Sequence, residues 1–418
     1  MNNVHFENKT ISHHFFWFIW VMYSIVYMTK SCFSAAMASI VFEGVMTKSQ
    51  TGLIISVFYL VYAPLQIYGG MLADKYDPEK LILIGLGGSG IANLIIYLNH
   101  NFYVMLIVWA LNAVVQFAVW PSIFKILSSQ LEKSYRKSAA FYITFSSSAG
   151  VLLAYFAAAV LPGWEYNFLM SGLLLILLCI VFYFVCKKTD RYMVDDGTDN
   201  KASVEIQQHC YKSTFDMFLK CGFFILIISM FLRFVADQAL KTYLPTMLME
   251  SYEGVSPSIA NVFNMFAVAI SMLGTLIAKF IYPRFIKNEA LSFSLMLLIA
   301  LPFTFALTFV GRLDIKLMII SASVIACAIT ATNLFKQYYC MQFTKYGKNA
   351  TAAGIVNCAD SFGIVVQSYC VGRLADGFGW NTVTVILFIV MAGAVVLSFI
   401  SVPLWIAFKK NKKTSVQN

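Results

Sequence analysis

The sequence predicts an all-α integral membrane protein in which twelve transmembrane helices form two six-helix halves. Of its 418 residues, 60% are hydrophobic and 12% are charged, whereas soluble domains are about 45–50% apolar and about 25% charged. Because a helix needs about 20 apolar residues to cross a bilayer, the chain is long enough for twelve crossings joined by short loops. This composition argues against a water-soluble enzyme.

The predicted spans are long apolar runs, and each ends where charged residues, glycine or proline interrupt the run. Loop charges mark many of the boundaries, for example Glu43, Lys75, Lys137, Glu165 and Arg312. In order, the spans cover residues 14–38, 50–73, 80–99, 102–126, 138–161, 165–187, 217–248, 256–282, 289–310, 315–339, 350–374 and 380–408.

The longest polar stretch lies in the middle of the chain and separates two sets of six spans. We therefore expect an N-terminal six-helix bundle at 1–188, a cytoplasmic linker at 189–214 and a C-terminal six-helix bundle at 215–418. Two landmarks recur: a cation follows an aromatic residue inside spans 1 and 7, at Lys30 and Arg233, and a Gly-Trp pair precedes spans 6 and 12. Such a parallel repeat is typical of transporters whose halves rock about a central cavity.

Loop charges predict the orientation, because short cytoplasmic loops carry an excess of Lys and Arg. The linker, the C-terminal tail and the loops on the same side hold most of the cations, for example Lys75, Lys137, Lys188, Lys348 and Lys412. We therefore expect a multi-pass, monomeric protein of the inner (plasma) membrane with both termini in the cytoplasm and no cleaved signal. The net charge of +10 reflects this orientation, and no basic patch indicates binding of nucleic acid.

Cysteine and histidine positions indicate neither a metal site nor catalysis. The nine cysteines form no C-x-x-C pair, and the five histidines lie in tails, loops or span ends. No nucleophile–base pair and no phosphate-binding glycine loop is visible. We therefore expect a protein that is not an enzyme and that uses no metal or cofactor.

Charged residues inside the spans indicate a binding site, because a charge at mid-bilayer costs several kcal/mol unless it faces protein or water. The deep candidates are Lys30, Arg233, Asp237, Lys241 and Asp360, whereas spans 3, 6, 9 and 12 hold no charge in their central stretches, as lipid-facing helices require. An ammonium and a guanidinium suit recognition of a phosphate or a carboxylate. Lys30 and Arg233 are therefore the predicted substrate-binding cations.

The carboxylates leave alternatives open. Asp237 follows Arg233 by four residues, so the two can form a structural ion pair, or Asp237 can compete with the substrate or exchange a coupling proton. Asp360 is either a coupling carboxylate or a partner for Lys30. Polar and aromatic residues on other spans are further candidates for the binding site, although helix packing is the more common role of any single one: Tyr59, Tyr62, Gln116, Trp120, Tyr142, Asn264, Asn333 and Gln337.

The loop from Gly70 to Lys80 resembles the G-x-x-x-D-[RK] loop of the major facilitator superfamily, and it stands between spans 2 and 3 as it does there. The resemblance implies a major facilitator fold in which Asp74 and Lys75 act as a conformational latch at the cytoplasmic helix ends. At the matching place in the second half, Pro283 and Arg284 stand where the family has an acidic residue and a cation.

Within this superfamily the chain resembles the organophosphate:phosphate antiporters over nearly its whole length. The similar stretches are Tyr27 to Lys30, Gln116 to Pro121, Leu232 with Arg233, and Thr351 to Gly354. The resemblance implies that Lys30 and Arg233 match the arginine pair that holds the phosphoryl group in that family. The chain differs from that family at three places: its first cation is a lysine, Lys30, Ser147 lies near the place of a family histidine, and Val268 lies near the place of a family carboxylate. These differences would also suit a monoanion such as a carboxylate.

We therefore expect a secondary active transporter in the lipid bilayer that moves a small organic anion, a phosphate ester or a carboxylate, by alternating access. A proton or inorganic phosphate is the expected coupling ion. The alternatives are a proton-driven exporter of drugs or metabolites and a non-transporting membrane sensor on the same fold.

Overall fold

The computed structural model describes residues 4–6, 8–132, 134–195, 214–284, 286, 288–343 and 348–414. The chain divides into two compact units. The first unit comprises Met1–Ala202 and Pro257–Val262, and the second comprises Ser203–Ser256 and Phe263–Asn418. The division falls inside the predicted linker 189–214, of which residues 196–213 lie outside the described part of the chain.

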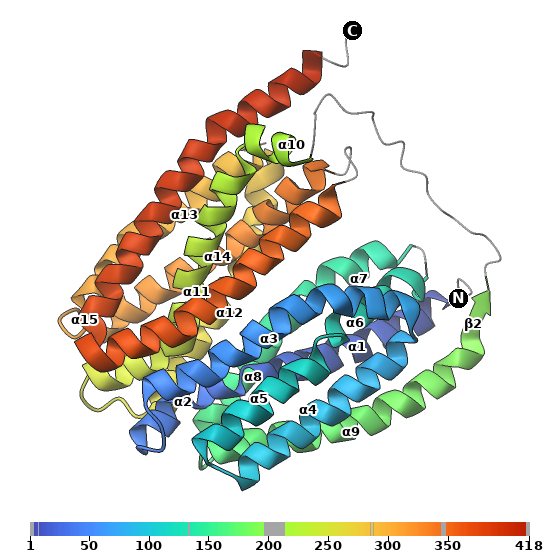
Figure 1. Ribbon diagram of the computed structural model, residues 1–418, viewed down its shortest axis with the longest axis horizontal. Helices are drawn as coiled ribbons and strands as arrows, with labels where there is room; N and C mark the ends of the chain where they lie inside the picture. The colour runs from blue at the N-terminus through green and yellow to red at the C-terminus, as the bar shows by residue number, and fades with distance from the viewer. Residues whose placement is uncertain are drawn as a thin grey trace. The chain divides into compact units, whose positions relative to one another are not determined.

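The first unit holds helices α1 to α9 and a small sheet (Figure 1). A short antiparallel ladder of β1 and β2 places Phe6 opposite Met193, and a turn of 3-10 helix at Asp190–Tyr192 precedes β2. The bounds are β1 Val4–Phe6, α1 Lys9–Lys30, α2 Cys32–Phe42, α3 Lys48–Lys75, α4 Pro78–Leu98, α5 Phe102–Gln116, α6 Val119–Ser129, α7 Arg136–Tyr142, α8 Thr144–Val160, α9 Glu165–Thr189 and β2 Met193–Asp195.

The second unit contains the remaining helices, except that the first residues of α12, Pro257–Val262, belong to the first unit (Figure 1). Their bounds are α10 Thr214–Lys220, α11 Phe223–Ser251, α12 Pro257–Arg284, α13 Glu289–Ala306, α14 Ile315–Met341 and α15 Asn349–Thr414, with a 3-10 turn at Leu307–Phe309 after α13. Helix α15 is broken at Gly379, which has a φ of 75° and non-helical geometry. The Gly-Trp pair that the sequence shows before span 12 therefore lies at a real turn.

The structure confirms the predicted all-α fold. By length and composition, nine helical stretches of the described chain can cross a membrane, and one of them, Ala352–Lys410, accounts for two spans because of the break at Gly379. Helix α3 and the shorter apolar helix α8 lie where spans 2 and 5 are predicted, so the helices follow one another in the predicted order.

Three predicted spans of the first unit are each made of two helices. Span 1 divides at Ser31, span 4 at Phe117–Ala118 and span 5 at Ile143. In span 4 the cause is Pro121, which has no N–H to donate to the carbonyl of Phe117. Helix α3 comes close at this point, since a Cβ at Gly69 would lie 2.9 Å from the Phe117 carbonyl oxygen. The sequence predicted unbroken spans because apolar composition continues across these breaks.

Glycines allow pairs of helices inside each unit to touch backbone to backbone. A Cβ at Gly150 of α8 would lie 2.2 Å from the carbonyl oxygen of Ser24 in α1, and one at Gly274 of α12 would lie 2.0 Å from the carbonyl oxygen of Cys327 in α14. No side chain fits at either place. These contacts fix where α1 and α14, which carry the candidates Lys30 and Asn333, lie within their units.

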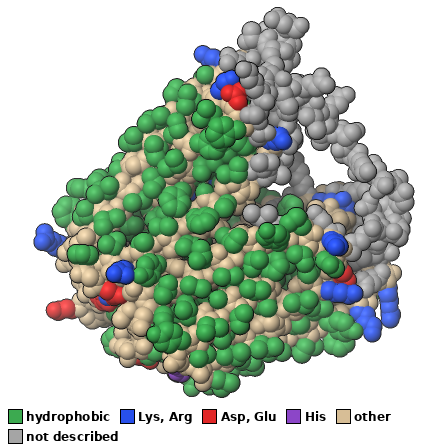
Figure 2. Space-filling model, in the orientation of Figure 1, with side chains coloured by type: hydrophobic (Ala, Val, Ile, Leu, Met, Phe, Trp, Pro, Cys, Tyr) green, Lys and Arg blue, Asp and Glu red, His purple; other side chains and the backbone are tan. Residues whose placement is uncertain are grey.

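The outer faces of the spans are apolar. Figure 2 shows hydrophobic side chains over most of the visible helical surface, with the coloured charges gathered toward helix ends. Helices α4 and α9 lie side by side and expose large side chains along much of their length, including Ile84, Ile91, Leu173, Leu177 and Phe184. An exposed apolar surface of this extent fits contact with lipid, as the sequence predicts for spans 3 and 6.

Candidate functional site

Lys30 is the last residue of α1 and lies buried in the first unit, with 8% of its surface exposed. Its Nζ donates a hydrogen bond of 2.8 Å to the Tyr62 hydroxyl and lies 4.2 Å from the centre of the Tyr62 ring and 5.4 Å from that of Tyr27. Within 8–132 and 134–195, no carboxylate forms an ion pair with it. The ammonium is therefore stabilised by aromatic faces and one hydroxyl.

Aromatic rings continue from Lys30 along α1. Tyr27 packs edge-on against Tyr23, and Tyr23 stacks on Trp120 of α6 with ring centres 4.9 Å apart. Tyr62 in turn stacks on Phe58 and packs against Tyr59, both in α3. The structure thus brings Tyr59, Tyr62 and Trp120 into one aromatic group with Lys30.

Two other candidates of the first unit have different neighbours. The Gln116 side chain donates to the Ser89 hydroxyl of α4 at 2.5 Å, so it joins two helices. Tyr142 is 46% exposed, and its ring lies beside Trp17, which precedes Lys30 by thirteen residues, or about 20 Å along a helix. The structure therefore places Tyr142 away from Lys30, because the break at Ile143 separates α7 from the part of span 5 that packs on Tyr27. A part for Tyr142 in binding stays a prediction.

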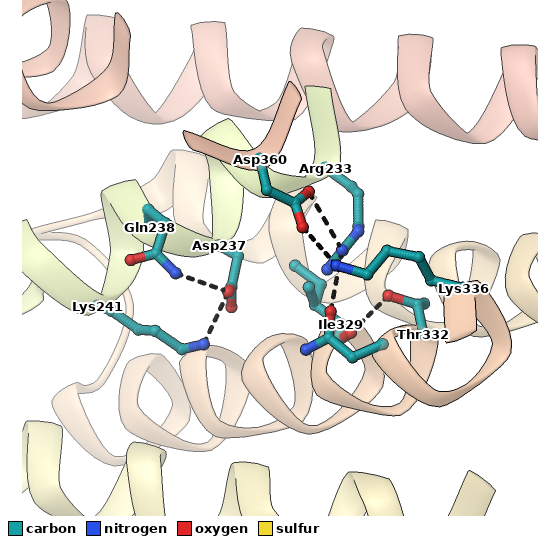
Figure 3. Close-up of polar contacts among 9 residues, drawn as sticks. Arg233, Asp237, Gln238, Lys241, Ile329, Thr332, Lys336 and Asp360 are labelled. Atoms are coloured by element: carbon teal, nitrogen blue, oxygen red, sulfur yellow. Dashed lines mark hydrogen bonds and ion pairs between the residues drawn. The ribbon is translucent and has the colours of Figure 1, made fainter. Parts of the chain in front are cut away.

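Arg233 lies in the middle of α11 and is fully buried in the second unit. Its Nη2 donates to Asn333 Oδ1 of α14 at 3.0 Å and lies 3.7 Å from Asp360 Oδ1 of α15 (Figure 3). Rings of Phe234 and Phe293 flank the guanidinium. Its Nε and Nη1 have no hydrogen-bond partner among the described residues. A buried guanidinium with two unused donors is suited to receive an anion.

Asp360 forms its closest ion pair with Lys336 of α14, through Oδ2 (Figure 3). Both side chains are mostly buried, 11% and 13% exposed. Sequence reasoning missed Lys336, because it lies near the end of predicted span 10, where cations usually extend toward water. One available signal was its spacing from Asn333, since residues three apart share a helix face.

Asp237 is also buried, and it does not pair with Arg233. Its Oδ2 accepts from Lys241 Nζ at 2.7 Å and from the Gln238 side chain at 3.3 Å (Figure 3). Of the alternatives that the sequence leaves open for Asp237, the ion pair with Arg233 is therefore not formed, and Asp237 pairs with Lys241 instead. Arg233 reaches its carboxylate on another helix.

The remaining candidates of the second unit differ in environment. Asn264 of α12 is buried and donates to the Lys241 backbone carbonyl, whereas Gln337 is exposed. Asn264 and Lys241 also line a cavity of about 10 Å³, room for roughly one water molecule, together with Leu240, Leu244, Ala267, Val268, Ala322 and Ala326. This space is too small to hold an organic substrate in the conformation described.

The residues of the predicted latch lie at the C-terminal end of α3. The side chain of Asp74 lies outside the described part of the structure, and Lys75 is exposed, with its Nζ 5.6 Å from the Tyr76 ring centre. In the second unit, a buried carboxylate at the start of α13, Glu289, accepts hydrogen bonds from Tyr282, Gln342, Trp405 and Lys409. It joins the ends of four helices, a role that sequence reasoning did not assign.

Known proteins similar to the chain agree with this architecture. The probable hexose phosphate transport protein of Chlamydia trachomatis is 21% identical over 432 residues, which cover 95% of this chain and 91% of that protein. The membrane sensor protein UhpC of Salmonella typhimurium is 29% identical over 161 residues. That match covers 38% of this chain and only 36% of the sensor protein.

The solved structure of a bacterial homologue of the human lysosomal transporter Spinster has the same fold. It superposes with a TM-score of 0.71 at 15% identity and covers 96% of this chain and 98% of that one. The family model for the Major Facilitator Superfamily matches residues 19–367. Because this match covers most of the chain, we conclude that the chain belongs to the Major Facilitator Superfamily.

Proposed function

We propose that the protein is a secondary active transporter of a small organic anion, with phosphate monoesters such as hexose phosphates as the favoured class. The observation that carries this proposal is Arg233, which is fully buried with Nε and Nη1 unpartnered in the described structure. A buried donor without a partner costs about 1–3 kcal/mol, and more when it is charged. An anion that enters from water and accepts these N–H groups recovers that cost.

Charge balance supports a dianion. The aromatic group around Lys30 and the two ion-pair clusters of the second unit contain four cations, Lys30, Arg233, Lys241 and Lys336, and two carboxylates, Asp237 and Asp360. With all six ionised, they carry a net charge of +2. A phosphate monoester carries about −1.5 to −2 at neutral pH, which is opposite in sign and similar in size to this charge.

The similar proteins support the same substrate class. The Chlamydia trachomatis protein, named as a probable hexose phosphate transport protein, matches this chain almost end to end. In a major facilitator protein the two halves bind the substrate from opposite sides and expose it alternately, so Lys30 and Arg233 would contribute one cation from each half. Either inorganic phosphate in exchange or a proton on Asp237 or Asp360 would drive the cycle.

A membrane sensor of external sugar phosphate is the second candidate. It is favoured by the match to UhpC, which is more identical to this chain than the transport protein is, although over a shorter stretch. A sensor would use the same cations to bind the ligand but would not carry it across the bilayer. Binding and transport therefore have to be measured separately.

Binding is tested by thermal unfolding of the purified protein in detergent with glucose 6-phosphate, inorganic phosphate, a sugar acid and glucose. We expect the phosphate compounds to raise the unfolding temperature. Arg233→Ala should weaken this binding about 30-fold or more, because it removes one partner of a buried charge pair. Arg373→Gln is the matched control, since Arg373 is an exposed cation that bonds only the Tyr369 hydroxyl in the described structure.

Transport is tested with the same variants in proteoliposomes loaded with inorganic phosphate. Uptake of labelled glucose 6-phosphate that requires internal phosphate indicates an antiporter, and uptake that follows a pH gradient indicates proton coupling. Binding without uptake assigns the protein to the sensor class. Stabilisation by the sugar acid alone, or equal stabilisation of wild type and Arg233→Ala, contradicts the proposal.

A further inference from the structure

We propose that Lys336 is a positioning residue that holds Asp360 away from Arg233, so that the guanidinium keeps the N–H groups of Nε and Nη1 for the substrate anion. The inference rests on the proposed function, because it takes Arg233 as the group that binds the anion. It gives a role to a buried cation that neither the sequence nor the similar proteins single out.

The geometry of Asp360 is unusual for a carboxylate beside a guanidinium. Such pairs commonly form two parallel hydrogen bonds. Here the nearest approach, from Arg233 Nη2 to Asp360 Oδ1, is 3.7 Å, beyond hydrogen-bond distance. Asp360 Oδ1 accepts no hydrogen bond in the described structure, and Oδ2 accepts from Lys336 Nζ. The carboxylate is thus bonded to the ammonium and only near the guanidinium.

Helix α14 supplies both groups that produce this arrangement. Asn333 and Lys336 are three residues apart and share one face of the helix. The Asn333 amide oxygen accepts from Nη2 and so fixes the plane of the guanidinium. Lys336 reaches past it to Asp360 on α15 (Figure 3). The result is a guanidinium held by its Nη2 only, with Nη1 and Nε unbonded.

Competition explains why such positioning matters. If Asp360 bonded Arg233 through both oxygens, an incoming anion would first have to displace it. The apparent affinity would then fall in proportion to the fraction of molecules with a free guanidinium. Lys336 offers Asp360 another cation and keeps that fraction high. The same ammonium also preserves the positive charge of the cluster, which Asp360 alone would cancel.

The first test measures affinity and transport rate separately for Lys336→Gln. We expect the KM and the Kd for glucose 6-phosphate, and the Kd for inorganic phosphate, to rise about tenfold, a size typical of coupling between neighbouring groups, with little change in the maximal rate. Lys336→Arg, which keeps the charge, should bind like wild type. Lys336→Gln combined with Asp360→Asn should recover affinity, because the neutral amide no longer competes for Arg233. Unchanged affinity in Lys336→Gln, or no recovery in the double variant, overturns the proposal.

The second test needs no substrate. Unfolding temperatures are measured for Arg233→Gln, for Asp360→Asn and for the double variant, and the coupling is the part of the double variant's shift that the two single shifts do not add up to. The set is measured first with Lys336 present and then in the Lys336→Gln background. We expect the coupling to grow by about 2 °C or more without Lys336, because Asp360 then bonds Arg233. Equal coupling overturns the proposal. This result stands even if the wild type binds no phosphate compound, which would reject the proposed function alone. Lys336→Met replaces Lys336→Gln if the latter does not fold.

Discussion

Lys30 shows how a cation can be buried in an apolar helix bundle without an ion pair to any carboxylate among the described residues of the first unit. Its ammonium has the Tyr62 hydroxyl as hydrogen-bond acceptor and the rings of Tyr27 and Tyr62 as electron-rich faces. A desolvated cation–π contact contributes about 2 kcal/mol, and a hydrogen bond to a charged group about 1.5–3 kcal/mol. Because these partners are neutral, the ammonium keeps its full charge for an anionic ligand.

Replacing Tyr62 with phenylalanine tests this description. The variant keeps the ring but removes the hydroxyl that accepts from Lys30 and from Gln66. We expect the free energy of unfolding to fall by about 1–2 kcal/mol, measured as a lower unfolding temperature in detergent. Tyr59→Phe is the control, since the Tyr59 hydroxyl makes no hydrogen bond within the described residues. Equal losses in the two variants would contradict the assigned role of the Tyr62 hydroxyl.

For single residues, the sequence predicts which charges lie inside the spans but not all of their partners. The types and spacings of Lys30, Arg233, Asp237 and Asp360 were enough to predict that charges lie inside the spans, and the structure finds all four buried. Their partners on other helices were not predictable. A long side chain such as Arg233 reaches residues on other helices, so its partner depends on how α11, α14 and α15 pack. No periodic pattern in the sequence indicates this packing.

Helices meet most closely where a glycine removes the side chain between them. At Gly150, α8 contacts the stretch of α1 that carries Tyr27. A Cβ added to Gly150 would lie 2.2 Å from the Ser24 carbonyl oxygen and 2.5 Å from the Tyr27 Cβ. Tyr27 is one of the two rings facing Lys30. The position of the ammonium therefore depends on a helix contact about one turn away.

A methyl group at Gly150 should separate these helices. We expect Gly150→Ala to lower the free energy of unfolding by about 1–3 kcal/mol, the usual cost of overpacking, and to weaken anion binding as Tyr27 shifts. Gly87→Ala in α4 is the matched control, because its Cβ would meet only Cys179 Sγ, at an ordinary 3.7 Å. It should change stability by less than about 1 kcal/mol and favour the helix. Thermal unfolding compares the two, and a tolerated Gly150→Ala would show that α8 can move away from α1.

At the element scale, the apolar runs predicted the number and order of the spans but not their internal breaks. Hydropathy measures transfer into lipid, and Phe117 and Ala118, where span 4 breaks, are as apolar as a regular span. The break depends on Pro121 and on the approach of Gly69. Only the first of these is visible locally. The breaks at Ser31 and Ile143 have no proline within the next four residues and could not be predicted from the sequence.

The whole molecule repeats its internal contacts from one unit to the other. Glu79, near the start of α4, accepts from Gln130 just after α6, and Glu289, at the start of α13, accepts from Gln342 just after α14. Gly150 contacts α1, and Gly363 of α15 lies against Phe231 and Phe234 of α11. These pairs occupy matching spans. They extend the two landmarks from which the sequence predicts an internal duplication.

The orientation of the whole molecule is a prediction from its loop charges. We expect green fluorescent protein fused after Asn418 or after Asp77 to fluoresce, because these sites lie on the cation-rich side. Alkaline phosphatase inserted at Gly44 or Gly311 should be active, because these turns lie on the opposite side. An active phosphatase fused after Asn418 would reverse the orientation and place the exposed Lys75 outside the cell.

The pairing of β1 with β2 determines how late during synthesis the N-terminal strand can take its final place. Phe6 is fully buried, its backbone N–H donates to the Gln130 carbonyl, and its strand pairs with Met193–Asp195. All residues up to Asp195 must therefore leave the ribosome before the N-terminal strand has its complete partner. By then every helix from α1 to α9 has been made. The N-terminal strand thus takes its final place only after the last helix of the first six predicted spans has been made.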